Sequence, residues 1–204
     1  GTLSFAQVGA FNANSLTTAS NATTSLAANS SLNLSGALTQ VGDSILNVTL
    51  GSITPVITAG SASLSGTLKV SGINTSAPTT NASDLQNTNV VLIHTTAGIS
   101  NDFTDIDLSG AASTVDYLSV IAGKSANNND YNVGLGLTWF AGSTSSNGIF
   151  TLTSPTDIFN VDMVLADQTA SATGWNGKLL TKNGAGTLVL SSTNTYSGDT
   201  LINQ

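Results

Sequence analysis

Arginine, glutamate and cysteine are absent from this chain of 204 residues, and only 7% of its residues carry a charge. Eleven acidic residues against four lysines give a net charge of −7. Proteins that bind nucleic acid or anionic membranes cluster Lys and Arg, so we expect neither partner. The absence of cysteine excludes disulfide bonds and thiolate metal sites, and it suits a chain that crosses a compartment unfolded.

Long apolar runs and the charged residues that usually face solvent on helices are also missing. No stretch approaches the roughly twenty apolar residues of a membrane-spanning helix, so we expect no membrane insertion of this segment. Ser, Thr and Asn supply roughly two-fifths of the residues, and their side chains compete with helical hydrogen bonds. Because Thr favours strands while Asn and Gly favour turns, the composition predicts an all-β protein.

Short pieces of sequence recur along the chain. The string LSGAL at 34–38 returns as LSGTL at 64–68. Toward the two ends, GDSILN at 42–47 matches GDTLIN at 198–203 position by position, allowing Ser for Thr and exchanged Ile and Leu. Repeated text of this kind is typical of proteins built from stacked structural units.

The repeated pieces have the pattern of β-strands. Leucine and valine alternate with polar residues, for example at Leu32 and Leu34, as expected of a strand with one buried face. Such runs recur every roughly 10–14 residues between turn signals. We therefore predict a right-handed parallel β-helix (β-solenoid), in which short strands coil and inward aliphatic side chains stack. A β-sandwich would give similar spacing but would not require repeated text.

The middle of the chain has longer strand patterns. TNVVLIHTTAGI (88–99) is consistent with a buried strand, and DYNVGLGLTWF (130–140) alternates, which favours a β-hairpin-bearing segment packed on the solenoid. We expect surface loops at 74–84 and 123–130. We divide the one solenoid segment 1–204 into repeat coils at 1–72, longer strands and loops at 73–170, and a final coil at 171–204.

The final coil resembles a known repeat. Residues 184–203 read GAGTLVLSSTNTYSGDTLIN, close to the autotransporter-associated β-strand repeat, whose usual text is G-A-G-T-L-x-L-S-G-x-N-T-Y-x-G-x-T-x-I-N. Ser192 departs from this text, where glycine is commoner. The preceding GWNGKLLTKNGAG (174–186) is similar to the lead-in of AIDA-type autotransporter adhesins. The structural positions that the resemblance assigns to the repeat are Gly184, Gly186, Leu188, Leu190, Tyr196 and Gly198.

This resemblance implies a bacterial autotransporter passenger domain, a parallel β-helix exported through the outer membrane to the cell surface or beyond. It implies two kinds of partner. One is the protein's own C-terminal β-barrel translocator, which this chain does not contain. The other is a ligand on a host or bacterial surface, or a second copy of the same chain.

We predict a non-enzymatic adhesin that mediates attachment or self-association through an extended polar solenoid surface. One alternative is a structural stalk or a folding template near the translocator barrel. A less favoured alternative is a polysaccharide-active or proteolytic passenger, because the absence of arginine leaves few groups to stabilise developing charge.

Few residues suggest chemistry, and we predict no catalytic residue, no cofactor and no metal site. His94 is the only histidine and lies in a buried-looking strand pattern, so we interpret it as structural. Asp102, Asp105 and Asp107 place three carboxylates within six residues, but without the spacing of known calcium loops. We interpret them as solvated acids in a turn.

Aromatic residues are the remaining candidates for ligand contact. Trp139, Phe140 and Trp175 could stack on sugar rings at a binding surface. Because neighbouring residues of a strand point to opposite faces, Trp139 and Phe140 cannot both do so. We expect one of them in the core and the other at the surface.

Overall fold

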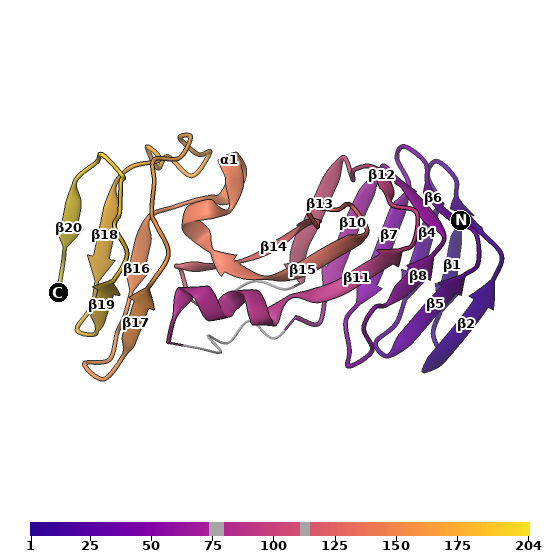
Figure 1. Cartoon of the computed structure of the whole chain (residues 1–204), viewed down its shortest axis with the longest axis horizontal. Coiled ribbons are helices and arrows are strands. Elements are labelled where there is room, and N and C mark those ends of the chain that lie inside the picture. The colour runs from indigo at the N-terminus through magenta and orange to yellow at the C-terminus, as the bar shows by residue number, and fades with distance from the viewer. Residues whose placement is uncertain (74–79, 111–114) are drawn as a thin grey trace. The chain divides into compact units, whose positions relative to one another are not determined.

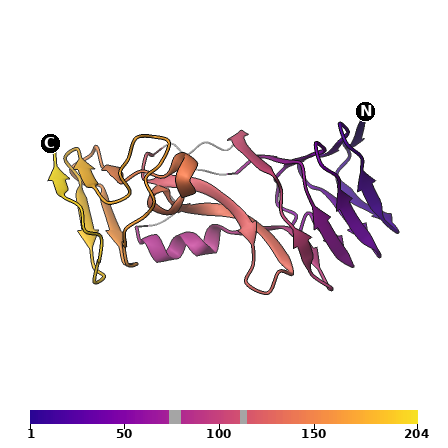
Figure 2. The same cartoon turned by 90° about the horizontal axis from the view of Figure 1, so that it is seen from above.

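The computed structural model describes residues 1–73, 80–110 and 115–204, and its regular structure is almost entirely β, as Figure 1 and Figure 2 show. The chain divides into two compact units, which are described in turn. Of the described residues, unit 1 comprises 1–73, 90–110 and 122–133, and unit 2 comprises 80–89, 115–121 and 134–204.

The described part of unit 1 is a solenoid whose coils have three sides, and each coil contributes one strand to each side, parallel to the strand before it (Figure 1). Side 1 contains β1 (Thr2–Phe5), β4 (Thr23–Leu26), β7 (Ile45–Thr49), β10 (Thr67–Ser71) and β13 (Asp105–Gly110). Side 2 contains β2 (Gly9–Ala13), β5 (Ser30–Leu34), β8 (Ile57–Ala59) and β11 (Val90–Thr95). Side 3 contains β3 (Leu16–Thr18), β6 (Ala37–Gln40), β9 (Ser61–Leu64) and β12 (Ile99–Asn101).

The register of side 1 gives the length of a coil. Thr2 pairs with Thr23, which is 21 residues later, and Thr23 pairs with Ile45, which is 22 residues later. The LSGAL and LSGTL strings are 30 residues apart, so they mark different corners of the solenoid. The first joins β5 to β6 and the second joins β9 to β10.

At the corner that leads into side 1, a residue with left-handed backbone recurs once per coil. Asn21, Asp43 and Gly66 each precede a strand of side 1, and each has a left-handed φ, of 59°, 61° and 69°. Asn, Asp and Gly are the residues that adopt this conformation at least cost. At Gly66 a Cβ would lie 2.3 Å from the carbonyl oxygen of Ser44, so glycine is required there.

The interior of unit 1 is filled by stacked aliphatic side chains. On side 1, Leu46 lies in register between Thr24 and Leu68, and all three are buried. On side 3, Leu38 lies between Leu16 and Ala62. Burial of one leucine side chain contributes about 1.5–3 kcal/mol, so repetition of these columns stabilises the coils.

The middle of the chain contains the predicted hairpin. β14 (Leu118–Lys124) and β15 (Asp130–Leu137) are neighbours in the side 2 sheet, where β15 pairs antiparallel with β11. Their connection lies within the loop predicted at 123–130. Of the other predicted loop, residues 74–79 lie outside the described residues. For the remaining residues 80–84 the loop prediction is wrong from Ala82 onward, because Ala82–Thr88 form the 3-10 helix η1.

Unit 2 has two further parallel stacks. One contains β16 (Ile149–Thr151), β18 (Leu180–Asn183) and β20 (Thr200–Ile202), and the other contains β17 (Ile158–Val161) and β19 (Thr187–Leu190). The 3-10 helix η2 (Thr138–Phe140) and α1 (Gly142–Ser145) precede them. Their core holds five buried aromatic side chains: Tyr117, Trp139, Phe150, Phe159 and Trp175.

The prediction of an all-β parallel solenoid is thus confirmed, and the stacked parallel strands exclude a sandwich of two antiparallel sheets. Among the described residues, no helix is long and apolar enough to cross a membrane.

Candidate functional site

The outer face of side 2 carries a row of polar side chains, one from each successive strand. Asn33 Nδ2 donates to Asn12 Oδ1 at 3.1 Å, and Thr58 Oγ1 donates to Asn33 Oδ1 at 2.9 Å. His94, in register with Thr58, bonds through Nδ1 to Asp130 Oδ1 at 2.6 Å. Stacking of the coils therefore links Asn12, Asn33 and Thr58 by hydrogen bonds, with the His94–Asp130 pair next in the row.

His94 belongs to this outer row rather than to the interior. Its side chain is 44% exposed, which corrects the expectation of a buried position. The antiparallel register of β11 and β15 places Asp130 opposite it. The Thr58 hydroxyl beside His94 donates to Asn33 rather than to the imidazole.

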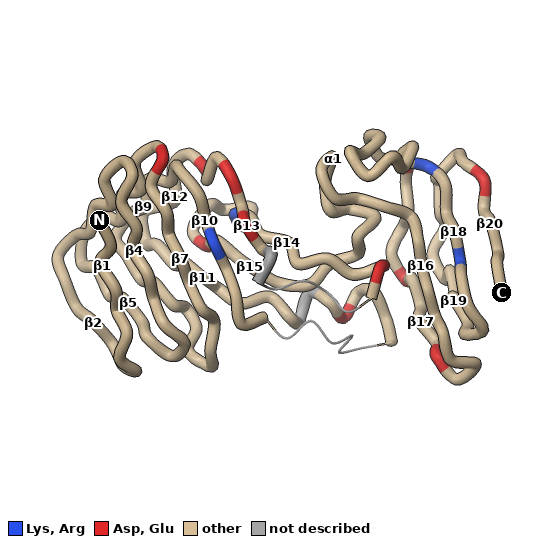
Figure 3. The backbone as a smooth tube through the Cα atoms, turned by 180° about the vertical axis from the view of Figure 1, so that it is seen from behind, with Lys and Arg blue, Asp and Glu red and all other residues tan. Residues whose placement is uncertain are grey.

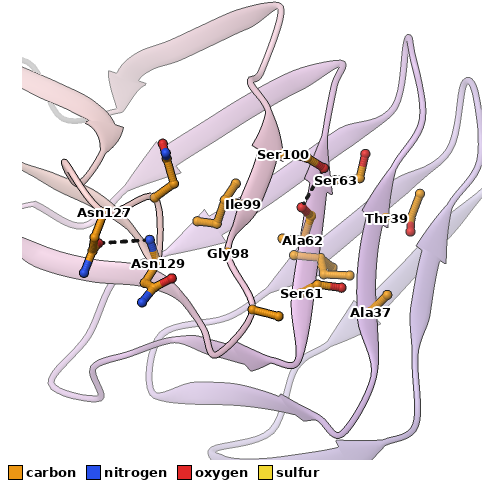
Figure 4. Close-up of a pocket in the computed structure, with 13 residues that line it drawn as sticks. Ala37, Thr39, Ser61, Ala62, Ser63, Gly98, Ile99, Ser100, Asn127 and Asn129 are labelled. Atoms are coloured by element: carbon orange, nitrogen blue, oxygen red, sulfur yellow. Dashed lines mark hydrogen bonds between the residues drawn. The ribbon is translucent and has the colours of Figure 1, made fainter.

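A groove lies over the outer face of side 3, with a volume of about 490 Å³ (Figure 4). Its floor is formed by β6, β9 and the segment 97–100, and the hairpin loop contributes residues 127–129. The outward row Thr39, Ser63 and Ser100 supplies hydroxyl groups, while Ala37 and Ser61 keep the adjoining row small. The lining contains no charged residue, and the strands of side 3 carry none either (Figure 3).

Backbone hydrogen bonds fix the hairpin loop against the floor of this groove. The amide of Ile99 donates to the carbonyl of Asn128 at 2.7 Å, and the amide of Thr95 donates to the carbonyl of Asn129 at 2.8 Å. Within the loop, Asn127 Oδ1 accepts bonds from Ser125 Oγ and from the amide of Asn129. The position of the loop is therefore fixed by bonds within the protein.

Two of the three clustered aspartates have separate structural partners, and Asp105 is exposed at the start of β13. Asp102 accepts the Tyr131 hydroxyl at 2.9 Å and also the amide of Phe103 at 2.8 Å. Burial, and next the bond to Asp102, raise the pKa of Tyr131 well above its usual value. Asp107 pairs with Lys69 Nζ at 3.1 Å. In the part of the chain that the structure describes, no three acidic or histidine side chains gather as a metal site would require.

Of the three aromatic candidates for ligand contact, two are buried and one is exposed. Trp139 is 1% exposed and donates through Nε1 to the carbonyl of Ala166 at 2.9 Å. Trp175 is 8% exposed and donates to the carbonyl of Leu179 at 2.7 Å. Trp139 is thus the member of the Trp139–Phe140 pair that lies in the core, and burial of Trp175 corrects its candidacy as a surface contact. Phe140 is 40% exposed, on the rim of a small apolar pocket of unit 2.

The glycines of the repeat lie where a side chain would strike backbone. Gly184 has a φ of 82°, and a Cβ there would lie 2.4 Å from the carbonyl oxygen of Leu152. At Gly198 a Cβ would lie 2.6 Å from the carbonyl oxygen of Lys178. A Cβ at Gly186 would meet carbonyl oxygens at 2.8 Å. These close approaches explain why glycine stands at all three positions.

The larger residues of the repeat differ in burial. Leu188 is partly buried and packs on the core of unit 2, and it pairs in register with Phe159. Leu190 pairs with Val161 but keeps 36% of its surface exposed. The Tyr196 ring lies edge-on to Trp139 at 5.4 Å between centroids, and its hydroxyl bonds to Thr200 Oγ1 at 2.7 Å. Tyr196 thereby connects β20 to the aromatic core.

Asp167 is a repeat contact that the sequence pattern did not reveal. Its carboxylate accepts the amide of Ser197 at 2.7 Å and the Ser197 hydroxyl at 2.8 Å, and Lys178 Nζ lies 3.2 Å away. The bonds from Ser197, followed by Lys178, lower the pKa of Asp167 below its usual value. This carboxylate fixes the turn before Gly198.

Comparison with protein families identifies this last coil. Residues 180–204 match the passenger-associated-transport-repeat family, a structural repeat of autotransporter passengers rather than a catalytic family. The chain thus carries an autotransporter passenger repeat, and the match indicates an exported segment. No curated protein and no solved structure matches the chain.

Proposed function

We propose that this chain is a non-catalytic binding segment of an autotransporter passenger, an adhesin that attaches its cell to a surface. The observation that carries the proposal is the stacking of polar side chains into rows on the outer faces of sides 2 and 3. Each coil adds one donor or acceptor to a row, so many weak contacts add up over an extended surface.

The passenger repeat at 180–204 and the solenoid fold support this role. The described residues that sequence suggested for catalysis form structural contacts, since His94 is held by Asp130 and Asp102 by Tyr131. In the whole protein, the segment would be exported by a C-terminal β-barrel translocator and would act on the cell surface or outside the cell.

The test is attachment by the purified chain. Fluorescently labelled chain is added to epithelial cell monolayers and, separately, to bacteria that display the chain. We expect saturable binding to the monolayer, or to the displaying bacteria if self-association is the mode of attachment. Labelled chain unfolded by heat is the control. Absence of saturable binding in both arms would contradict the adhesin role.

A second role, that of a folding template near the translocator, is favoured by a different observation. The family match is confined to 180–204, and this segment is anchored to residues before it: Tyr196 packs on Trp139, and Ser197 bonds to Asp167. A coil this well anchored could support the stacking of its neighbours. Loss of passenger folding at the cell surface after deletion of the repeat, with attachment by the purified chain unaffected, would favour this role.

A further inference from the structure

We propose that the groove over side 3 binds a segment of an uncharged glycan. This inference rests on the proposed binding function and names the site and the chemical class of its ligand. The groove residues are 37–39, 61–63, 97–100 and 127–129. The volume of the groove, about 490 Å³, falls within the range of about 300–1,000 Å³ that small-molecule sites occupy.

The hydroxyl row suits a ligand that is itself rich in hydroxyl groups. Thr39 and Ser63 lie side by side in neighbouring strands, and Ser63 and Ser100 likewise, at the strand spacing of about 4.8 Å. Ser100 donates to the carbonyl of Ala62 at 3.1 Å and keeps its lone pairs for a further donor. A saccharide chain lying across the strands would meet a new hydroxyl at each step.

The amides of the hairpin loop add a second set of polar groups at one end of the groove. Figure 4 shows Asn127 and Asn129 on the loop beside Gly98 and Ile99. Gly98 has a φ of 95°, and a Cβ there would come no closer than 3.9 Å to any atom of the loop, so the floor beneath these amides stays open. Because the loop is held by backbone bonds, little ordering accompanies binding.

Charge and size distinguish a glycan from other ligands. An anionic polysaccharide would need Lys or Arg in the lining, and none is there. An extended peptide would need pockets for alternate side chains, whereas Ala37, Ser61, Ala97 and Gly98 leave a shallow floor. Small residues let a sugar ring approach the sheet closely while its hydroxyls reach Thr39, Ser63 and Ser100.

The experiment titrates the whole chain with hexasaccharides and follows backbone amides by NMR. The probes are maltohexaose, cellohexaose and chitohexaose, with a heparin-derived hexasaccharide as the anionic arm. We expect at least one uncharged probe to shift amides at 37–39, 61–63, 97–100 and 127–129. Shifts confined to other residues, no shift by any uncharged probe, or stronger binding of the heparin fragment in the groove would overturn the proposal.

Variants make the assignment specific. Ser61→Trp fills the groove from an outward position and should abolish the shifts. Thr67→Trp, with the same bulk outward on side 1, should leave them unchanged. Thr39→Val keeps the shape but removes one hydroxyl, and should weaken binding about three- to tenfold, with Thr67→Val as its control. Unchanged affinity of Ser61→Trp or of Thr39→Val would contradict the site.

The same variants separate this inference from the proposed function. If Ser61→Trp attaches to cells as the unmodified chain does and no uncharged probe binds, the groove proposal fails while the adhesin role stands. If uncharged probes bind the groove but the chain attaches to neither cell type, the adhesin role fails and the groove remains a glycan site.

Discussion

The indole rings of Trp139 and Trp175 meet edge to face, with centroids 4.8 Å apart and an interplanar angle of 71°. Trp175 comes from the segment that leads into the passenger repeat, and Trp139 from the 3-10 helix η2. Their nitrogens are satisfied by backbone carbonyls, so both rings can be buried without an unpaired donor. This pair connects the last coils of unit 2 to its core.

Trp139→Ala should therefore destabilise unit 2 by about 3–5 kcal/mol, since it removes a buried ring together with its contacts to Trp175 and Tyr196. The adjacent Phe140→Ala is the matched control and should cost markedly less than Trp139→Ala, because Phe140 is 40% exposed whereas Trp139 is 1% exposed. Urea unfolding followed by tryptophan fluorescence measures both, since Trp175 remains in each variant. Equal effects of the two substitutions would contradict the assigned burial.

Leucines that share the same alternating strand pattern should differ in how much stability is lost when each is replaced by alanine. Leu46→Ala removes a fully buried member of a stacked column and should cost about 2–5 kcal/mol. Leu188→Ala removes a partly buried side chain and should cost about 1–2 kcal/mol. Because the two residues lie in different units, hydrogen exchange of β7 and of β19 should report each effect separately. A larger loss of stability from Leu188→Ala than from Leu46→Ala would contradict the partial burial of Leu188.

A buried polar chain crosses the interior of unit 1. Thr18 and Thr24 share a hydrogen bond of 2.7 Å, Gln40 donates to Thr18 at 2.9 Å, and Ser44 donates to Gln40 at 3.1 Å. Gln40→Leu would strip the buried Ser44 hydroxyl of its partner and should cost about 1–3 kcal/mol.

Addition of Ser44→Ala to Gln40→Leu should recover part of that stability, because the orphaned hydroxyl is then gone. Chemical unfolding of the two single variants and the double variant gives the coupling between the residues. Strictly additive losses would show that the two side chains act independently.

The architecture could be predicted from the sequence because alternation and repeated text report on local strand formation. The number of residues in one coil could not be predicted from the sequence. Its most regular marker is the left-handed corner at Asn21, Asp43 and Gly66, where three different residue types serve the same φ. LSGTL contains Gly66 and lies at that corner, whereas LSGAL joins β5 to β6 at a different corner, so the distance between the two strings obscures the coil length.

The site was harder to predict for a related reason. Alternation required Trp139 and Phe140 to face opposite ways, but it did not say which of them the core takes. The His94–Asp130 pair depends on the antiparallel pairing of β15 with β11, which joins residues 36 positions apart. The groove gathers four short segments of Ser, Thr, Ala and Asn, and these residue types are too common in this chain to carry a signal.

Acid should loosen the repeat through Asp167. The pKa of this carboxyl is lowered in the folded state, so its interactions stabilise the fold above the unfolded pKa of about 4 and are lost as pH falls through the folded value. Asp167→Asn should therefore be less stable than the unmodified chain at pH 7, and the difference should vanish near pH 2. Urea midpoints at both pH values measure this. A difference that persists at pH 2 would mean that the charge is not responsible.

Removal of residues 180–204 should unfold unit 2 but not unit 1. The deletion takes away β18, which pairs with β16, β19, which pairs with β17, and the Tyr196 ring that covers Trp139. Solenoid coils are stabilised mainly by immediate neighbours, and unit 1 has its own stacked core on sides 1 and 3.

Hydrogen exchange of the shortened chain should then show loss of protection in β16 and β17, with β4, β5 and β7 still protected. Leu180→Ala in the full chain, which removes one buried side chain from the first strand of the repeat, should weaken β16 and β17 in the same order but less completely. Full protection of β16 and β17 after the deletion would show that unit 2 does not depend on the repeat. Loss of protection in β4, β5 and β7 as well would contradict neighbour-limited stability, and would favour a repeat that templates the folding of the whole passenger segment.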